Sequence, residues 1–147
     1  GSFAGIIQGI VYAADHGADV INMSLGTDLP RGAGADSNDI AELVNATKRA
    51  VQYARSQNAL VVAAAGNDGR DLDHDASLVS FPAQLPGVLS ISSTAPLAWA
   101  KAPASTFLDN RASYTNYGQS GISFSAPGGD FSYPGNEACT VRGVTTA

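Results

Sequence analysis

The sequence predicts an α/β protein with a parallel sheet and flanking helices. Two short apolar runs, Ala18–Leu25 and Leu60–Ala65, have the length of buried strands. Between them, apolar residues recur with a helical period from about Asp39 to Gln57. A strand, a helix and a second strand in this order form a βαβ unit, so the two strands are expected to be parallel and covered on both faces.

The first element is expected to be a helix near the start of the chain. Its apolar residues lie three, four, seven, eight and eleven positions apart, on one helical face: Phe3, Ile6, Ile7, Ile10, Val11 and Ala14. The helix is predicted to end near Asp15, with Gly17 as the left-handed residue that follows it.

The segment between the first strand and the second helix, Thr27–Ser37, contains Pro30 and two glycines and is predicted to be a loop. Asp39 and Glu42 have the spacing of a capping box at the start of the second helix. Asn58 can adopt the left-handed conformation where this helix ends.

A third strand is predicted over Val88–Ser92, after turn-forming prolines at 82 and 86. The chain then becomes rich in Ser, Thr, Gly and Pro, without an internal repeat or a domain linker. The 147 residues are therefore expected to form one domain.

Composition excludes several classes of function. The 8 basic residues are scattered and the net charge is −5, so no basic surface for nucleic acid is predicted. The longest apolar runs are too short to cross a membrane. The single cysteine, Cys139, has no partner for an internal disulfide and no neighbouring metal-ligand pattern.

Four segments in register resemble the subtilisin-like serine proteases, the subtilase family (peptidase S8). They are Asp19–Gly26 (DVINMSLG), Val61–Gly69 (VVAAAGNDG), Phe81–Val88 (FPAQLPGV), and Arg111–Gly118 (RASYTNYG) leading to SAPG at 125–128. The resemblance covers nearly the whole chain in the order and spacing of the family. It implies the family's three-layer architecture, incomplete in this chain, with residues 1–147 as the middle part of the peptidase domain.

The resemblance assigns the substrate-binding strand to Ser24, Leu25 and Gly26, where an extended peptide can add beside an exposed strand edge. Residues 1–3 would form the opposite edge, and Ala64–Gly66 would also contact substrate. Phe3, Ile6 and Leu25 would line the apolar pocket for the fourth residue before the cleaved bond. The alternative is that these three side chains simply belong to the core.

Asn67 would be the oxyanion-hole donor by the same resemblance. Its side-chain amide would stabilise the negative charge that develops on one oxygen of the tetrahedral intermediate. The alternative interpretation of Asn67-Asp68-Gly69 is an ordinary turn. The resemblance also implies a cis peptide at Phe81-Pro82, with Ser80 near the floor of the specificity pocket and Asp68 near its rim.

The catalytic Asp, His and Ser of the family have no counterparts at their places in this sequence. His16 is interpreted as structural or exposed, because a cationic side chain is favoured at a helix C-terminus. The resemblance as a whole implies that the parent protein is a secreted, extracellular serine endopeptidase. We expect the 147-residue chain alone to be inactive.

No cofactor is predicted, although calcium stays open for the parent enzyme. The loop Asp71–Asp75 alternates carboxylates, but it lacks the Gly and the closing Glu of a calcium-binding loop, which favours a solvated surface loop. Some subtilases bind a weak cation with carbonyls that match Ala83, Leu85 and Val88 and with later carboxylates. Gly121 and Ser123 occupy the matching later positions here, so no metal ligands are assigned.

The sequence leaves two other classes of function open. A subtilase-derived pseudoenzyme, or an isolated fragment, would bind peptide without cutting it. A nucleotide-binding α/β domain is disfavoured because no Gly-x-Gly-x-x-Gly follows either strand. The expected partners are a peptide or protein substrate, together with companion segments of the same protease or a second copy of the chain, and neither nucleic acid nor a membrane.

Overall fold

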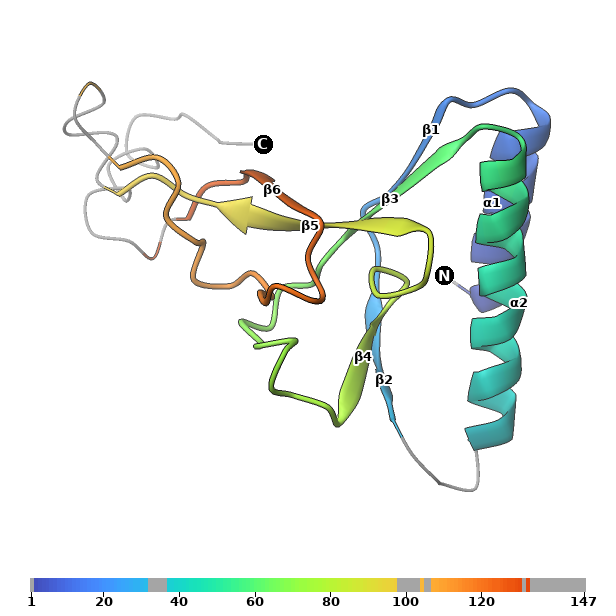
Figure 1. The fold of residues 1–147 in the computed structure, drawn as a ribbon, viewed down its shortest axis with the longest axis horizontal. Coiled ribbons are helices and arrows are strands. Elements are labelled where there is room, and N and C mark those ends of the chain that lie inside the picture. The colour runs from blue at the N-terminus through green and yellow to red at the C-terminus, as the bar shows by residue number, and fades with distance from the viewer. Residues whose placement is uncertain (1, 32–36, 98–103, 105–106, 131, 133–147) are drawn as a thin grey trace.

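The computed structural model describes residues 2–31, 37–97, 104, 107–130 and 132 (Figure 1). Along the chain the elements are α1 Phe3–Asp15, β1 Val20–Met23, β2 Thr27–Pro30, α2 Ser37–Ser56, β3 Leu60–Ala64, β4 Leu78–Phe81, β5 Val88–Thr94 and β6 Phe124–Pro127. Cys139 and Gly1 lie outside the described residues. No helix in the described ranges is long and apolar enough to cross a membrane.

The main sheet is parallel and has the strand order β1-β3-β5-β6. Val20 pairs with Leu60 and Ile91 with Phe124. A second, antiparallel sheet joins β2 to β4. The predicted α/β class and the parallel pairing of the first two predicted strands are both confirmed.

Both helices end close to where the sequence predicts, but α2 begins at Ser37, so Asp39 lies inside its first turn and not at its start. The Ser2 hydroxyl caps α1 by accepting a hydrogen bond from the Gly5 amide at 3.1 Å. Gly17 follows the helix with a φ of 73°, and Asn58 follows α2 with a φ of 66°. Both residues have the left-handed conformation that ends a helix.

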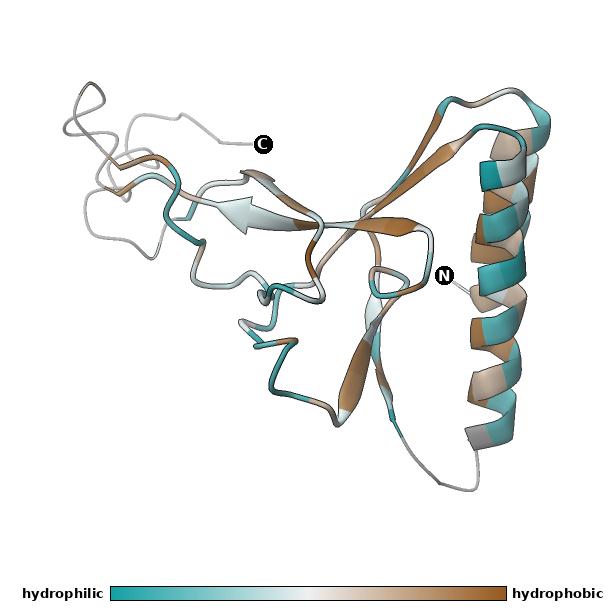
Figure 2. Ribbon diagram, in the orientation of Figure 1, coloured by the Kyte–Doolittle hydropathy of each residue, from teal (hydrophilic) through white to brown (hydrophobic). Residues whose placement is uncertain are grey.

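The core lies between the sheet and the two helices, which run side by side (Figure 1). Alternate strand residues face the helices and are buried, among them Ile21, Met23, Val61 and Ala63. Figure 2 shows that β1 and β3 are apolar along most of their length. On the opposite face, however, Val20 is 56% and Leu60 is 44% exposed.

The prediction that these strands are buried on both faces is therefore wrong for this structure. A run of apolar residues fits a doubly covered strand, but the described residues place helices over one face only.

Two predicted boundaries also differ. The first strand is Val20–Met23, shorter than Ala18–Leu25, because its pairing with β3 ends at Met23. The predicted loop at Thr27–Ser37 begins with the strand β2, which pairs with β4 as far as Pro30. Proline lacks an amide hydrogen, and this one stands at the last position of a strand in a two-stranded sheet, where that loss is tolerated.

Candidate functional site

A pocket of about 360 Å³ lies where β1 and β3 end, and the carboxyl ends of parallel strands are the usual place for ligands in α/β sheets. Three segments form its walls: the residues after β1, the residues after β3, and the end of β4. The lining residues are Ser24, Leu25, Gly26, Thr27, Asp28, Ala64, Ala65, Gly66, Asn67, Asp68, Ser80 and Phe81.

The structure brings together most of the residues that the sequence proposes for the site. Six of them lie in the two strand-end segments 24–26 and 64–66, and Asn67 and Ser80 complete the group. Leu25 and Asn67 are exposed at the pocket, whereas Ser80 is buried in its wall. Asp68, predicted for the rim, also lines the pocket.

Phe3 and Ile6 do not line this pocket. Both belong to α1 and pack against the buried core. The Phe3 ring lies 5.1 Å from the ring of Phe81, which itself lines the pocket, so Phe3 contacts the site through that aromatic wall.

Gly26 has a packing role that the sequence did not indicate. A Cβ atom at this position would lie 3.0 Å from the carbonyl oxygen of Phe81. The absence of a side chain therefore lets the segment after β1 approach the end of β4. The Phe81-Pro82 peptide that follows is cis, as predicted.

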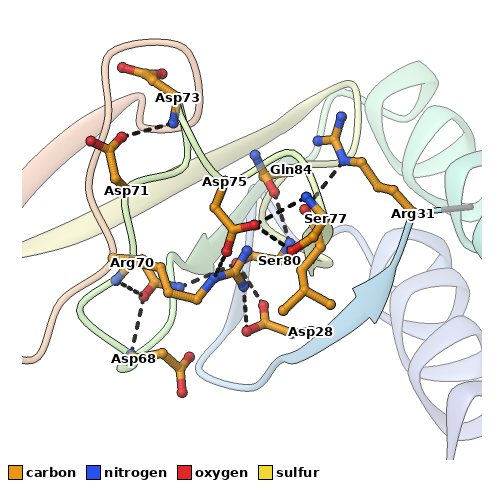
Figure 3. A network of polar contacts seen from close by, with 12 residues as sticks. Asp28, Arg31, Asp68, Arg70, Asp71, Asp73, Asp75, Ser77, Ser80 and Gln84 are labelled. Atoms are coloured by element: carbon orange, nitrogen blue, oxygen red, sulfur yellow. Dashed lines mark hydrogen bonds and ion pairs between the residues drawn. The ribbon is translucent and has the colours of Figure 1, made fainter.

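A chain of polar contacts runs from two residues of the pocket wall, Ser80 and Asp28, to Asp75 (Figure 3). The Ser80 hydroxyl donates to Asp28 at 2.9 Å. Asp28 in turn pairs with Arg70 at 2.5 Å, and the Nε of Arg70 contacts Asp75 at 2.9 Å. Sequence reasoning missed Asp28 because it falls in the segment predicted to be a loop.

Arg70 stays charged in this setting. Its partial burial favours the neutral form, but hydrogen bonds to Asp28 and Asp75 outweigh that effect and raise the pKa of Arg70. The pKa of Asp75 is lowered by hydrogen bonds from Ser77 and by Arg70. The cation thus offsets the negative charge that Asp28 brings to the pocket wall.

The turn that carries Asn67 is attached to a distant segment of the chain, Tyr114–Asn116. The Gly69 amide donates to the Tyr114 carbonyl at 2.8 Å, and the Asn116 amide donates to the Gly66 carbonyl at 3.0 Å. The Asn116 side chain is fully buried against the same turn. Asn116 lies in the segment Arg111–Gly118, which resembles the subtilase family, but the spacing of residues in that segment does not predict this contact.

The acidic loop Asp71–Asp75 is tied to other backbone segments. Asp73 accepts hydrogen bonds from the amides of Gln119 and Ser120 and from the Ser120 hydroxyl, and these contacts lower its pKa. His74 contacts Asp71 at 2.9 Å, which raises the pKa of His74 and lowers that of Asp71. The contacts of Asp73 hold the loop against residues Gln119 and Ser120.

A second pocket of about 540 Å³ includes the segments that match the family's weak cation site: Ala83, Leu85, Val88, Gly121 and Ser123. Ser123 accepts a hydrogen bond from the Ser90 amide at 3.1 Å. Within the described ranges, no three His, Cys, Asp or Glu side chains are grouped so as to hold a metal ion.

The chain is similar over its whole length to a known protein family. A family model described as "Subtilase family" matches residues 1–147. Subtilisin BL from Lederbergia lenta is 30% identical over 149 aligned residues, which cover 100% of this chain and 44% of the relative. A thermophilic serine proteinase from Bacillus sp. (strain AK1) is 32% identical, with 100% of this chain and 29% of the relative covered.

Among solved structures, the epidermin leader peptide processing serine protease of Staphylococcus aureus matches with a TM-score of 0.73 and 26% identity. That match covers 97% of this chain and 35% of the other. The chain therefore spans less than half the length of each of these relatives.

Proposed function

Because the chain belongs to the subtilase family, we propose that the protein containing it is an extracellular serine endopeptidase that hydrolyses peptide bonds in proteins. In this proposal the chain supplies the substrate-binding strand, a wall of the specificity pocket and the oxyanion-hole Asn67. The catalytic Asp, His and Ser would come from segments other than residues 1–147, and no organic cofactor is required.

The observation that carries the proposal is the convergence of Ser24–Gly26, Ala64–Asn67 and Ser80 on one pocket at the carboxyl ends of β1 and β3. An extended peptide laid along Ser24–Gly26 can form main-chain hydrogen bonds there, as in strand addition. Asn67 is exposed in the same pocket, so its amide is available to a carbonyl oxygen of that peptide. Its N–H can stabilise the oxygen as it becomes negative.

The pocket also bears on specificity. Its floor and walls combine Ala64, Ala65 and Phe81 with the Ser80 hydroxyl, which suits a large apolar side chain before the cleaved bond. Asp68 at the rim gives a basic side chain a partner, whereas an acidic side chain would meet like charge. A strict acidic preference in a peptide library would contradict this assignment.

The exposed apolar side chains of β1 and β3 support a further part of the proposal. Val20 and Leu60 lie on the sheet face that the described helices leave uncovered. Companion segments of the same protease, or a second copy of the chain, would cover this face and remove its apolar area from water.

The test is hydrolysis of a chromogenic peptide by the intact protein expressed from its own gene, with inhibition by a serine-directed phosphonate. Asn67→Ala is expected to lower kcat by about 100- to 1,000-fold, a magnitude known from the oxyanion-hole asparagine of subtilisin, a member of the same family. Asn45→Ala, which removes an exposed amide from α2, is the matched control and should leave kcat unchanged.

The outcomes separate the candidate functions. Peptide binding without hydrolysis by the intact protein would favour the non-catalytic pseudoenzyme. Hydrolysis that is insensitive to Asn67→Ala would reject the oxyanion assignment but leave the peptidase assignment standing.

A further inference from the structure

We infer that Asn116 is a positioning residue for the candidate site: its side chain fixes the turn that carries Asn67 and ties that turn to the Ser80 wall. The inference rests on the proposed function for its catalytic consequence. Its structural content, the fixing of the turn, stands independently of that function.

The first observation is the set of hydrogen bonds that Asn116 makes. Its Oδ1 accepts from the backbone amides of Asp68 at 3.1 Å and Arg70 at 3.0 Å. Its Nδ2 donates to the Ala65 carbonyl at 3.0 Å. Its own backbone amide donates to the Gly66 carbonyl at 3.0 Å. Asn67 therefore lies between backbone groups that are all held by one residue.

The second observation is burial. Asn116 is 0% exposed, so water does not replace any of these partners when one is lost. A buried donor or acceptor left without a partner costs about 1–3 kcal/mol. The amide thus favours one geometry of the turn over its alternatives.

The third observation is the fit of the backbone to this side chain. Gly66 has a φ of 110°, and a Cβ atom built there would overlap Nδ2 of Asn116. The turn approaches the amide so closely that residue 66 has no room for a side chain. The backbone at Gly66 and the side chain of Asn116 therefore pack directly against each other.

The same side chain reaches the specificity pocket. Nδ2 lies 3.3 Å from the Ser80 hydroxyl, which also donates to Asp28. One buried amide therefore connects the segment after β3 to the pocket wall on β4. Any shift of Asn116 would change the position of Asn67 relative to the pocket in which the peptide is held.

The chemistry requires an amide at this position. Oδ1 must accept two hydrogen bonds and Nδ2 must donate, and only asparagine has both functions at this side-chain length. An aspartate would keep the acceptor, but its second oxygen would face the Ala65 carbonyl. A protonated aspartic acid would regain one donor.

The experiment is a double-mutant cycle between positions 67 and 116 in the intact protein, with kcat measured per titrated active site. A displacement of about 1 Å at a reacting group can cost about 100-fold in rate, so Asn116→Ala is expected to lower kcat by about that factor. If Asn116 acts through Asn67, adding Asn116→Ala to Asn67→Ala should change kcat by less than about threefold, because residues that act as a unit are not additive.

Two further variants distinguish positioning from a general loss of stability. Asn116→Asp should recover activity relative to wild type as the pH is lowered, because protonation restores a donor toward Ala65. Val51→Ala, which removes buried volume from α2, should lower stability without changing kcat. A catalytic loss in Val51→Ala equal to that in Asn116→Ala would overturn the inference.

Hydrogen exchange gives a readout that does not depend on activity. The amides of Asp68 and Arg70 should exchange faster in Asn116→Ala than in wild type, relative to the amides of α2. Unchanged exchange of these two amides, or effects at 67 and 116 that multiply fully, would overturn the inference. Wild-type protein that lacks hydrolysis would instead reject the proposed function, and the exchange data would still decide the role of Asn116.

Discussion

Gly66→Ala perturbs the turn at its contact with Asn116, and its cost can be worked out from the structure. A residue with a side chain at a φ of 110° is strained, which costs of order 1–3 kcal/mol. The new Cβ would also overlap Nδ2 of Asn116, so that amide must move away from the Ala65 carbonyl. Losing the donor to a buried carbonyl adds about 1–3 kcal/mol.

The expected loss in the free energy of unfolding is therefore roughly 2–6 kcal/mol for Gly66→Ala, the sum of strain and a broken buried contact. Gly17→Ala is the matched control. Gly17 also has a positive φ, 73°, but a Cβ atom there has no other atom within 4 Å. For Gly17→Ala, the loss in the free energy of unfolding should be limited to the strain of a left-handed backbone that carries a side chain, about 1–2 kcal/mol.

The assay is equilibrium unfolding in urea, with the intact protein inhibited to prevent self-digestion. Adding Gly66→Ala to an Asn116→Ala background should cost less than adding it to wild type, because the overlapping amide is already absent. Equal losses in Gly66→Ala and Gly17→Ala, or full additivity with Asn116→Ala, would refute the reasoning.

Three further predictions follow from other parts of the structure. His74→Gln should lower stability near pH 5 and have little effect near pH 9. Because the pKa of His74 is raised in the folded protein, its contribution to stability is present below the unfolded pKa and is lost as the pH rises through the folded pKa. A series of urea midpoints measured at different pH values would show this. Val51→Ala should cost about 1–3 kcal/mol by the same assay, since the side chain is fully buried; a cost near zero would show that the core relaxes around it. The 147-residue chain alone should self-associate through the face that exposes Val20 and Leu60, and a strictly monomeric species in sedimentation equilibrium that binds no apolar dye would contradict this.

The helices were predictable because their signals are local. The helical period of apolar residues and the left-handed residues Gly17 and Asn58 predict where α1 and α2 end, and the structure agrees within about one residue. The strand β2 was not predictable in this way. Thr27–Pro30 has turn-like residues, and it becomes a strand only through its pairing with β4, some 50 positions further along the chain.

The residues of the candidate site show the same difference between local signals and contacts with distant segments. Ser24–Gly26 and Ala64–Asn67 were assigned from the resemblance to the subtilase family. Each segment follows a strand, and the parallel register brings the two strand ends together. Asp28 and Asn116 were missed because their roles depend on contacts with distant segments. Asn116 contacts Ala65 from 51 positions away, and no periodicity or spacing marks such a contact.

The sheet shows why an apolar run alone does not predict burial on both faces. Val20 and Ile21 are both apolar, yet Ile21 packs against the helices while Val20 is 56% exposed. Leu60 and Val61 on the neighbouring strand repeat this difference, since paired residues on parallel strands share a face. The second apolar row costs free energy in water, at roughly 25 cal/mol per Å². In the proposed function, companion segments or a second copy of the chain cover this face, so the exposed face belongs to the functional proposal as well as to the fold.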